Sequence, residues 1–415
     1  MKNASFKIAA AAFAVASAFA SQAYAAGFQL TEQSSLGLGR AYAGAGIVGD
    51  DLSAVHYNPA GMTLLPGANF QAGVVYIDTN LEFEGNHPNC SENGRYGKGQ
   101  GIPAGYFTRQ ISEDVWFGMG LTVPFGMGTG YNKNWEHADR GTDSTILTFD
   151  INPNLAWKIN EFVSIGAGVS FQYAEAKLGM DVPGTSIHAR IKADSWDFGY
   201  NLGIMISPTD KLRFGLSYRS AIEHDAEGTL DLSGIPAVIF PVSNASLGSS
   251  ATVKTPDTVM LTATWEATQD LRLSGLIRWA NWSNFETLTI STPTLAGTMV
   301  GSTMQVHNNW EDTWLFSLGA DYRLNNEWTI RGGIAYEMDA IDDQKTRMAV
   351  IPDTDRLWLA FGASYKYSDS LQFDVGAAWL TGVGNTDLYD TQGEKVGEYS
   401  TLDAYLLGAQ LVYRF

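Results

Sequence analysis

The sequence predicts an all-β fold, a 14-stranded antiparallel transmembrane β-barrel plugged by a small N-terminal hatch. Three observations predict it: a secretory signal at the start, alternation of apolar and polar residues in blocks of about ten, and an aromatic last residue, Phe415. Because successive side chains of a strand point to opposite faces, this alternation gives one face that suits lipid and one that suits a wet lumen.

Residues 1–25 have the parts of a secretory signal peptide. Lysines precede an apolar run that ends at Ala20, and Ala23-Tyr24-Ala25 supplies a small-x-small cleavage site. We therefore expect the mature chain to begin at Ala26. An exported bacterial barrel belongs in the outer membrane, which is where we expect this protein.

The mature chain is strongly acidic. The formal net charge is −18, and removing Lys2 and Lys7 with the signal lowers the basic residues from 26 to 24 against 44 acidic ones, which gives −20. A protein with this charge is a poor candidate for binding nucleic acid. Cys90 is the single cysteine and has no partner for an intramolecular disulfide. The six histidines have no metal-ligand spacing, so we expect neither a metal nor a cofactor.

No mature segment qualifies as a transmembrane helix. The long uncharged stretches, 232–253 and 287–305, are interrupted by Pro, Gly, Ser and Thr. A chain without such helices can span a membrane only as a closed barrel, because hydrocarbon offers no water to satisfy free backbone groups. A secreted soluble all-β protein is the alternative.

Residues 68–415 contain fourteen alternating runs, an even number, and we assign them to the barrel. Short turns alternate with connections of roughly 12 to 25 residues, as in bacterial barrels with short periplasmic turns and long external loops. Aromatic residues near the strand ends, such as Trp157, Trp379 and Tyr413, would form the interfacial girdles. The predicted strands are centred near Val74, Tyr106, Met119, Ile151, Val169, Tyr200, Leu216, Leu261, Ile277, Leu318, Ile334, Phe361, Val375 and Leu411.

Residues 26–67 do not alternate. They are rich in Gly and Ala and hold too few large apolar residues for a core of their own, so they must pack against something else. A plug inside the barrel, the hatch, is the economical answer. A disordered periplasmic tail is the alternative, but the segment is more apolar than such tails usually are. Its large apolar residues include Leu30, Leu36, Leu38, Tyr42, Leu52, Val55 and Tyr57.

Four motifs in this segment are recognisable. They are Ala26-Gly27-Phe28-Gln29-Leu30, the glycine-rich run Gly37-Leu38-Gly39-Arg40-Ala41-Tyr42-Ala43-Gly44, the pair Asp50-Asp51, and Asn58-Pro59-Ala60-Gly61. In them the chain resembles the hatch of the FadL/TodX family of outer-membrane transporters for long-chain fatty acids and other hydrophobic compounds. The resemblance covers the whole mature chain, since that family is built as an N-terminal hatch followed by a fourteen-stranded barrel.

The resemblance implies transport of a hydrophobic small molecule without energy coupling. External loops capture the ligand, a greasy interior site holds it, and it leaves sideways through a wall opening caused by an inward kink of the third strand. The resemblance also implies that Phe28 helps to close the interior pocket, and that Asn58, Pro59 and Ala60 form a hatch turn with a structural or a gating role. We expect a monomer in contact with outer-membrane lipids and lipopolysaccharide.

The third strand is unusual in its own right. One face carries large apolar side chains from Val115 to Met127, while the other face is nearly free of side chains. Pro124 has no N–H for the ladder and no free edge on which to lie. We therefore expect a local break beside an empty lane, which would serve as the exit; an ordinary bulge is the alternative. The residues assigned to this opening are Gly118, Gly120, Pro124 and Gly126.

Ligand contacts are expected at two further places. The connection from Leu232 to Val242 is unusually apolar for an external loop, and exposed apolar patches mark binding surfaces. Packing of that loop on itself is the alternative. Arginines on the predicted lumen face could hold a carboxylate by a charge-assisted pair, although such arginines more often pair with protein carboxylates. The residues assigned to ligand binding are Phe28, Ile235, Val238, Ile239, Phe240, Arg278 and Arg331.

The sequence thus favours a passive outer-membrane channel for long-chain fatty acids or similar hydrophobic molecules. Uptake of aromatic hydrocarbons is the nearest alternative and would need no cation inside the barrel. An outer-membrane lipid hydrolase would need a Ser or His constellation near the rim, and none is evident, so we do not expect an enzyme. A general polar porin is a further alternative, but a hatch would plug its lumen.

Overall fold

The computed structural model describes the chain from Gly27 to Phe415 with several gaps. The described residues are 27–86, 99–131, 141–181, 186–235, 243–285, 287–292, 302–307, 310–347, 349, 351–390 and 393–415. The predicted signal peptide, the predicted mature start and three predicted loop contacts, Val238, Ile239 and Phe240, lie outside the described residues.

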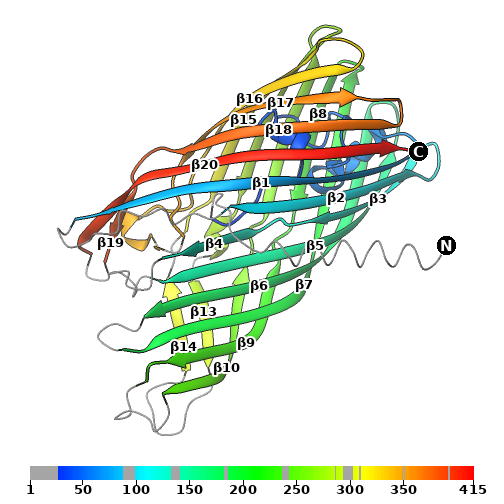
Figure 1. Ribbon diagram of the computed structural model, residues 1–415. Helices are drawn as coiled ribbons and strands as arrows, with labels where there is room; N and C mark the ends of the chain where they lie inside the picture. Colours follow the sequence, from blue (N-terminus) through cyan, green and yellow to red (C-terminus); the bar gives the residue numbers. More distant parts are fainter. Residues whose placement is uncertain are drawn as a thin grey trace.

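Strand segments of the described chain form one antiparallel sheet (Figure 1). They are β1 (Ala68–Gly85), β2 (Gln100–Gln110), β3 (Val115–Thr122), β4 (Gly126–Gly130), β5 (Asp143–Lys158), β6 (Val163–Asp181), β7 (His188–Thr209), β8 (Leu212–Arg219), β9 (Glu223–Ser233), β10 (Asn244–Lys254), β11 (Thr258–Glu266), β12 (Leu271–Ala280), β13 (Thr287–Thr292), β14 (Ser302–His307), β15 (Thr313–Arg323), β16 (Trp328–Glu337), β17 (Arg356–Lys366), β18 (Leu371–Gly382), β19 (Asp387–Tyr389) and β20 (Lys395–Arg414).

The sheet is closed, because β1 pairs with β20 along its length. Six wall strands consist of two segments each: β3 with β4, β8 with β9, β10 with β11, β12 with β13, β14 with β15, and β18 with β19. The twenty described segments therefore make a wall of 14 strands, and the predicted fold class is confirmed. Closure leaves the sheet without a free first or last strand, as a membrane-spanning sheet requires.

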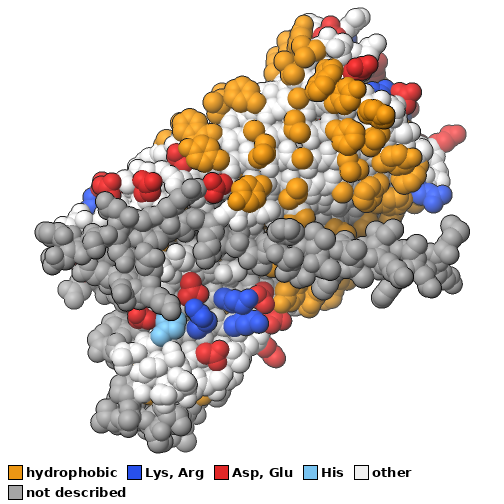
Figure 2. Space-filling view, viewed as in Figure 1, with side chains coloured by type: hydrophobic (Ala, Val, Ile, Leu, Met, Phe, Trp, Pro, Cys, Tyr) orange, Lys and Arg blue, Asp and Glu red, His pale blue; other side chains and the backbone are white. Residues whose placement is uncertain are grey.

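The outward side chains of the wall form an apolar band (Figure 2). In β20, Leu407 and Tyr413 are exposed, while Gln410 between them is buried. Val412, which interrupts the polar face of this strand, is fully buried in a cluster with Leu52. Position along the strand therefore decides which side chains face outward, and the inward positions pack against chain inside the barrel.

The segment 27–65, for which we keep the name hatch, lies inside the barrel and is dark blue in Figure 1. It contains two short helices, α2 (Ser35–Leu38) and α3 (Ala54–Tyr57), and the 3₁₀ helix η1 (Pro59–Leu64). Two further 3₁₀ helices, η3 (Trp282–Phe285) and η4 (Gln344–Thr346), follow β12 and β16. No helix in the described part of the chain has the length and apolar character to cross a membrane.

The hatch packs so closely that glycine is required at particular positions. A Cβ atom on Gly61 would lie 1.7 Å from the carbonyl oxygen of Gly46, and Gly46 itself has a φ of +82°. Glycine alone adopts such a φ without steric cost and allows such an approach. The Gly-rich composition of this segment therefore follows from how tightly its turns fold on one another.

Candidate transport path

The hydrogen-bonded wall is interrupted beside β2. The β2–β3 ladder stops at Leu121, and β4 pairs with β5 alone among the described residues. The segment 123–125 separates β3 from β4. Continuing the β2–β3 register would place Pro103 opposite Val123, one residue before Pro124. Since proline has no N–H, neither strand can complete a regular ladder here.

The N-terminal part of the hatch takes the place of the missing strand partner. Gln29 forms an antiparallel bridge with Phe125, flanked by two backbone hydrogen bonds. In one of them Leu30 N–H donates to the Pro124 carbonyl at 2.8 Å. In the other, the Phe28 carbonyl accepts at 2.9 Å from the first residue of β4. The hatch thus closes the ladder where β2 does not.

Gln33 adds a side-chain clamp on the same segment. Its Nε2 donates to the Val123 carbonyl at 2.7 Å, and its Oε1 accepts from the Val123 N–H at 3.2 Å. Gln33 is fully buried, and Tyr106 donates to its carbonyl at 2.8 Å. One side-chain amide therefore supplies the donor and the acceptor that a strand would supply. Nothing in the sequence marks Gln33, because its role depends on where the hatch meets the wall.

Phe28 is the centre of an aromatic cluster at this junction. It is 2 % exposed, and its ring centroid lies 5.9 Å from that of Phe125, 4.8 Å from Trp282 and 5.5 Å from Phe285. Trp310 lies 6.0 Å away on the same side. Since Phe125 belongs to the interruption and Phe28 to the hatch, this cluster joins the hatch to the break in the ladder.

An apolar cavity of about 70 Å³ lies against Phe28 inside the barrel. Small and aliphatic side chains make most of its surface, and His224 and Glu175 are its ionisable lining residues. The other lining residues are Ile146, Thr148, Ala174, Ala176, Leu178, Ile191, Ala193, Ala226, Ala251, Val253, Thr255, Phe285 and Ile351. Apolar cavities with few polar groups are typical of sites for hydrophobic ligands.

The cavity exists because the faces of β6 and β7 reverse their character toward the loops. In the membrane band the outward residues are apolar, whereas beyond it the outward residues are charged, such as Lys177, Arg190 and Lys192. The inward residues there are apolar, such as Ala193. Figure 2 shows basic side chains gathered over these strands, apart from the apolar band. The alternation of the strands predicts a wet lumen and the family resemblance implies a greasy interior site, and this part of the lumen is apolar.

The two arginines assigned to ligand binding have protein partners. Arg278 donates to Thr31 Oγ1 at 2.7 Å and pairs with Glu337 at 2.7 Å. Arg331 pairs with Asp321 at 2.9 Å. Neither lines the apolar cavity. Arg278 thus joins the wall to the hatch, whereas Arg331 bonds to Asp321 and Ser364 within the wall, and a role of either arginine in ligand binding stays a prediction.

His224 gathers a serine and an aspartate without forming a hydrolytic triad. Ser195 Oγ lies 3.0 Å and Asp197 Oδ2 3.2 Å from the same ring nitrogen, Nδ1, while Nε2 faces Gln172 Oε1 at 3.0 Å. A triad needs the serine and the carboxylate on different nitrogens of the ring. This constellation therefore gives no support to a lipid hydrolase.

The Asn58-Pro59-Ala60 turn is fastened to the wall. Asn58 Oδ1 accepts from the Ala60 N–H at 3.1 Å, and its Nδ2 donates to the Ile204 carbonyl of β7 at 3.1 Å. Pro59 begins η1, where its missing N–H costs nothing. A Cβ on Gly166 of β6 would lie 2.6 Å from the backbone of this turn, so the wall is shaped to receive it.

Hatch side chains cover the face of the third strand that carries Gly118, Gly120 and Gly126. The expectation that the space beside these glycines is empty is wrong for this state. A Cβ on Gly118 would lie 2.3 Å from Met62 Sδ, and one on Gly120 would lie 3.3 Å from Val55. A Cβ on Gly126 would lie 2.9 Å from Leu30. Hatch side chains occupy the space that these glycines leave, because the hatch needs a close approach to the wall.

The apolar loop that was assigned to capture is described only at its ends. Ile235 is 9 % exposed, and its N–H donates to the Ser243 carbonyl at 3.1 Å. Its burial fits the alternative that this loop packs on itself. A capture role for the loop stays a prediction.

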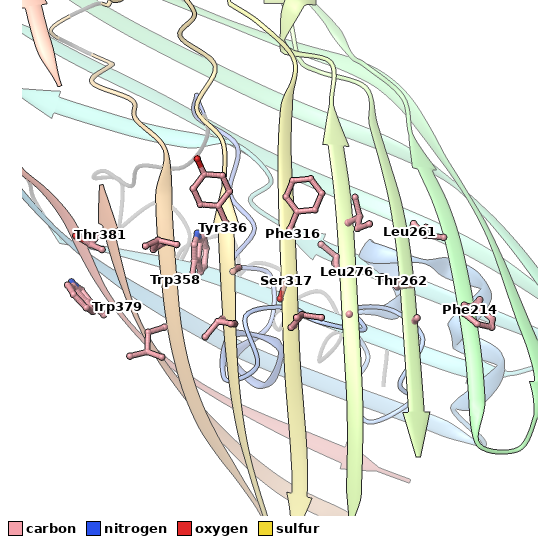
Figure 3. A pocket seen from close by; sticks show the side chains of 18 residues that line it. Phe214, Leu261, Thr262, Leu276, Phe316, Ser317, Tyr336, Trp358, Trp379 and Thr381 are labelled. Carbon is pink, nitrogen blue, oxygen red and sulfur yellow. The ribbon is translucent and has the colours of Figure 1, made fainter. Parts of the chain in front are cut away.

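A hollow of about 890 Å³ is a concavity of the wall and not of the lumen (Figure 3). Its side chains Phe316, Tyr336 and Trp379 belong to the exposed apolar band. Ser317 and Trp358, which also border it, point inward: Ser317 donates to a hatch carbonyl at 2.6 Å. Lipid suits such a surface, so we do not assign the transported ligand to it.

Known proteins resemble the chain along almost its whole length. Residues 16–415 match a family model described as outer membrane protein transport protein (OMPP1/FadL/TodX). The long-chain fatty acid transport protein of Escherichia coli O6:H1 is 30 % identical over 97 % of this chain and 98 % of that protein. The crystal structure of a Pseudomonas aeruginosa FadL homologue has a TM-score of 0.84 and 25 % identity, covering 94 % of this chain and 100 % of that chain.

A second solved structure shares the fold at lower identity. The Ralstonia pickettii toluene transporter TbuX has a TM-score of 0.68 and 20 % identity, covering 94 % of this chain and 99 % of that chain. The chain described here is itself an outer-membrane transport protein and not an enzyme. By its closed 14-stranded barrel and its match from residue 16 to the last residue, the chain belongs to the outer-membrane transport protein family OMPP1/FadL/TodX.

Proposed function

We propose that this chain carries long-chain fatty acids or similarly apolar molecules passively into the outer membrane, and that they leave sideways through the break between β2 and β4. One observation carries the proposal: Phe28 both lines the apolar cavity and belongs to the segment that closes the break. A ligand that enlarges the cavity must displace Phe28, and the same displacement removes the substitute partner of the wall. The relatives named long-chain fatty acid transport proteins support this cargo.

The energies allow such a displacement. A chain of about sixteen carbons gains roughly ten kcal/mol or more on leaving water, at about 0.8 kcal/mol for each methylene. The four hydrogen bonds by which residues 28–33 hold the interruption contribute about 0.5–1.5 kcal/mol each. Releasing Phe28 from its cluster adds roughly 1.5–3 kcal/mol for the lost burial of its side chain. Burial of the cargo still exceeds the summed cost of releasing the segment, and no other energy source is needed.

Sideways exit would bring the cargo directly into lipid. The apolar band faces the outer-membrane lipids, and basic side chains such as Arg190 and Lys192 lie above it, where the phosphates of lipopolysaccharide would contact them. We also propose capture by the apolar loop around Ile235, Val238, Ile239 and Phe240, and a monomeric barrel. A route within one barrel has no need of a second copy.

A cross-link tests the exit. In a Cys90→Ser background, Gln29→Cys with Phe125→Cys would join the hatch to the interruption, since antiparallel bridge partners are close enough for a disulfide. Uptake of labelled oleate by cells should fall several-fold when the pair is oxidised and return on reduction. A control pair on the β1–β20 seam, Val74→Cys with Ala409→Cys, should leave uptake unchanged. Equal uptake with the hatch pair oxidised and reduced would reject the route.

Aromatic hydrocarbons are the second candidate cargo. The observation that favours them is the absence of Arg and Lys from the described lining of the cavity, so a carboxylate would find no cation there. Labelled toluene should then enter cells through this protein and compete with oleate where oleate is also taken up. Uptake of toluene without uptake of oleate would make hydrocarbons the cargo.

A further inference from the structure

Glu32 is a buried carboxyl without a hydrogen-bond donor. It is 1 % exposed, and neither of its oxygens has a partner among the described residues. The residues on either side of it are both fastened to the wall, because Thr31 accepts from Arg278 and Gln33 clamps Val123. Glu32 therefore lies in the middle of the stretch that closes the ladder.

The charged groups around Glu32 do not compensate for its burial. Burial, with a smaller contribution from Glu337 of β16, raises the pKa of Glu32 to about 8. The backbone N–H of Glu32, Arg278 of β12 and Arg356 of β17 act in the other direction, but Arg278 pairs with Glu337 at 2.7 Å and Arg356 with Asp353, and neither guanidinium forms a hydrogen bond with Glu32. The hatch tyrosines that face the same carboxyl are Tyr42 and Tyr57.

We propose that Glu32 is a proton-dependent latch, protonated while the hatch is seated and ionised when the segment 27–34 is released. A carboxylate is disfavoured in a buried site where no neighbouring side chain donates to it, whereas the neutral acid is tolerated there. The inference rests on the proposed function in one respect, that this segment moves. It adds that movement releases a proton, so acid keeps the segment in place.

The direction of the effect follows from linkage. Below about pH 4.5 both states hold the proton, and above about pH 8 neither does, so release becomes easier only between these limits. Between about pH 5.5 and about pH 7.5 the released population should rise on the order of tenfold to a hundredfold. The dependence should be absent where Glu32 cannot ionise.

Thiol labelling of the full chain tests the latch. In a Cys90→Ser background, Gln29→Cys reports release of the segment through its rate of alkylation by a maleimide. Ser112→Cys, in an exposed turn, reports how the rate of alkylation of an accessible thiol depends on pH. The measured quantity is the alkylation rate of Gln29→Cys divided by that of Ser112→Cys. The ratio should rise with pH in the chain with Glu32 and stay flat in Glu32→Gln. Glu113→Gln, at an exposed glutamate, should keep the rise.

Two outcomes overturn the proposal. A labelling ratio that stays constant with pH in the chain that carries Glu32 overturns the proposal, whether or not Glu32→Gln folds. An unchanged rise in Glu32→Gln, shown to be folded by its heat-modifiable migration, does so as well. The labelling experiment uses no cargo. A negative result would therefore reject the proton-dependent latch without deciding the proposed function, which the oleate cross-linking experiment tests separately.

Discussion

At the scale of single residues, the Gln33 side chain makes the two hydrogen bonds that a neighbouring strand would otherwise make. It satisfies the N–H and the C=O of Val123, which is itself 4 % exposed. Buried backbone groups without partners are costly, so a break in a membrane wall is tolerated only if something else bonds to them. Here a hatch side chain does this, and the wall therefore depends on the hatch being seated.

Gln33→Ala should loosen the hatch at the break. It leaves two buried backbone groups of Val123 without partners, at a cost of about 1–3 kcal/mol for the closed state. Alkylation of Gln29→Cys in the Cys90→Ser background should become about fivefold faster or more, since about 0.8 kcal/mol already changes a population fourfold. Gln269→Ala, in an exposed turn, is the matched control and should change nothing. Equal alkylation rates in Gln33→Ala and the control would show that the Gln33 side chain does not stabilise the seated hatch.

Gly61→Ala should unseat the hatch. The added Cβ would lie 1.7 Å from the Gly46 carbonyl, which is backbone and cannot rotate away, so we expect a loss of about 1–3 kcal/mol or more. A displaced hatch opens a water path, and steady conductance in planar bilayers should rise. Gly248→Ala, where a Cβ meets nothing within 4 Å, should conduct as the unchanged protein does. A closed, folded Gly61→Ala barrel would contradict this packing.

At the scale of elements, the strands were predictable and the course of the hatch was not. Every predicted strand centre lies in a strand, because alternation with period two depends on local geometry alone. Phe28 could be singled out by resemblance, and Pro124 by its missing N–H. Gln33, Glu32 and the filled glycine lane could not be found, because their environment is made by residues far away in sequence.

Pro124→Val should lower uptake without lowering barrel assembly. Valine brings an N–H and a β-branched side chain, both of which favour a continuous strand from β3 into β4. Pro103 opposite the interruption still limits the repair, so we expect a several-fold loss of oleate uptake and not its abolition. Pro208→Val, in an exposed position near the end of β7, is the control. Unchanged uptake in a well-assembled Pro124→Val barrel would remove the break from the path.

At the scale of the whole molecule, the hatch is held unequally at its two ends. Near the break it is held by the aromatic cluster and by hydrogen bonds, two of which involve a charged wall residue: Arg278 donates to Thr31, and Asp353 accepts from Gly27. Farther along, Arg40 pairs with Asp50 at 2.6 Å and lies 3.4 Å from Asp321, which in turn pairs with Arg331 of the wall. Breaking a buried ion pair leaves an uncompensated charge, so this end should stay seated while the first residues move.

Arg40→Met should therefore release the whole hatch, whereas Gln33→Ala releases only its start. Removing the guanidinium takes away the shortest ion pair of Asp50 and leaves Arg272 and Arg331 as the remaining partners of Asp50 and Asp321, at a cost of up to about 3–5 kcal/mol. Thr63→Cys reports the far part of the hatch, where Thr63 bonds to Ser164 at 2.9 Å. Its alkylation should accelerate strongly in Arg40→Met and hardly at all in Gln33→Ala. Arg109→Met, at an exposed arginine, is the matched control.

The two ends of the hatch should also respond differently to pH. Although burial opposes it, Arg40 holds the pKa of Asp50 well below its ordinary value. A carboxyl with a lowered pKa stabilises the seated hatch at every pH above its ordinary pKa, and loses that contribution only as the pH falls toward the lowered value. Burial raises the pKa of the neighbouring Asp51, which adds some dependence on pH at this end, so between about pH 5 and about pH 8 corrected labelling at Thr63→Cys should change less than labelling at Gln29→Cys, which rises with the ionisation of Glu32. Parallel changes at both positions would mean that the hatch moves as one body, and would contradict a path opened by its first residues alone.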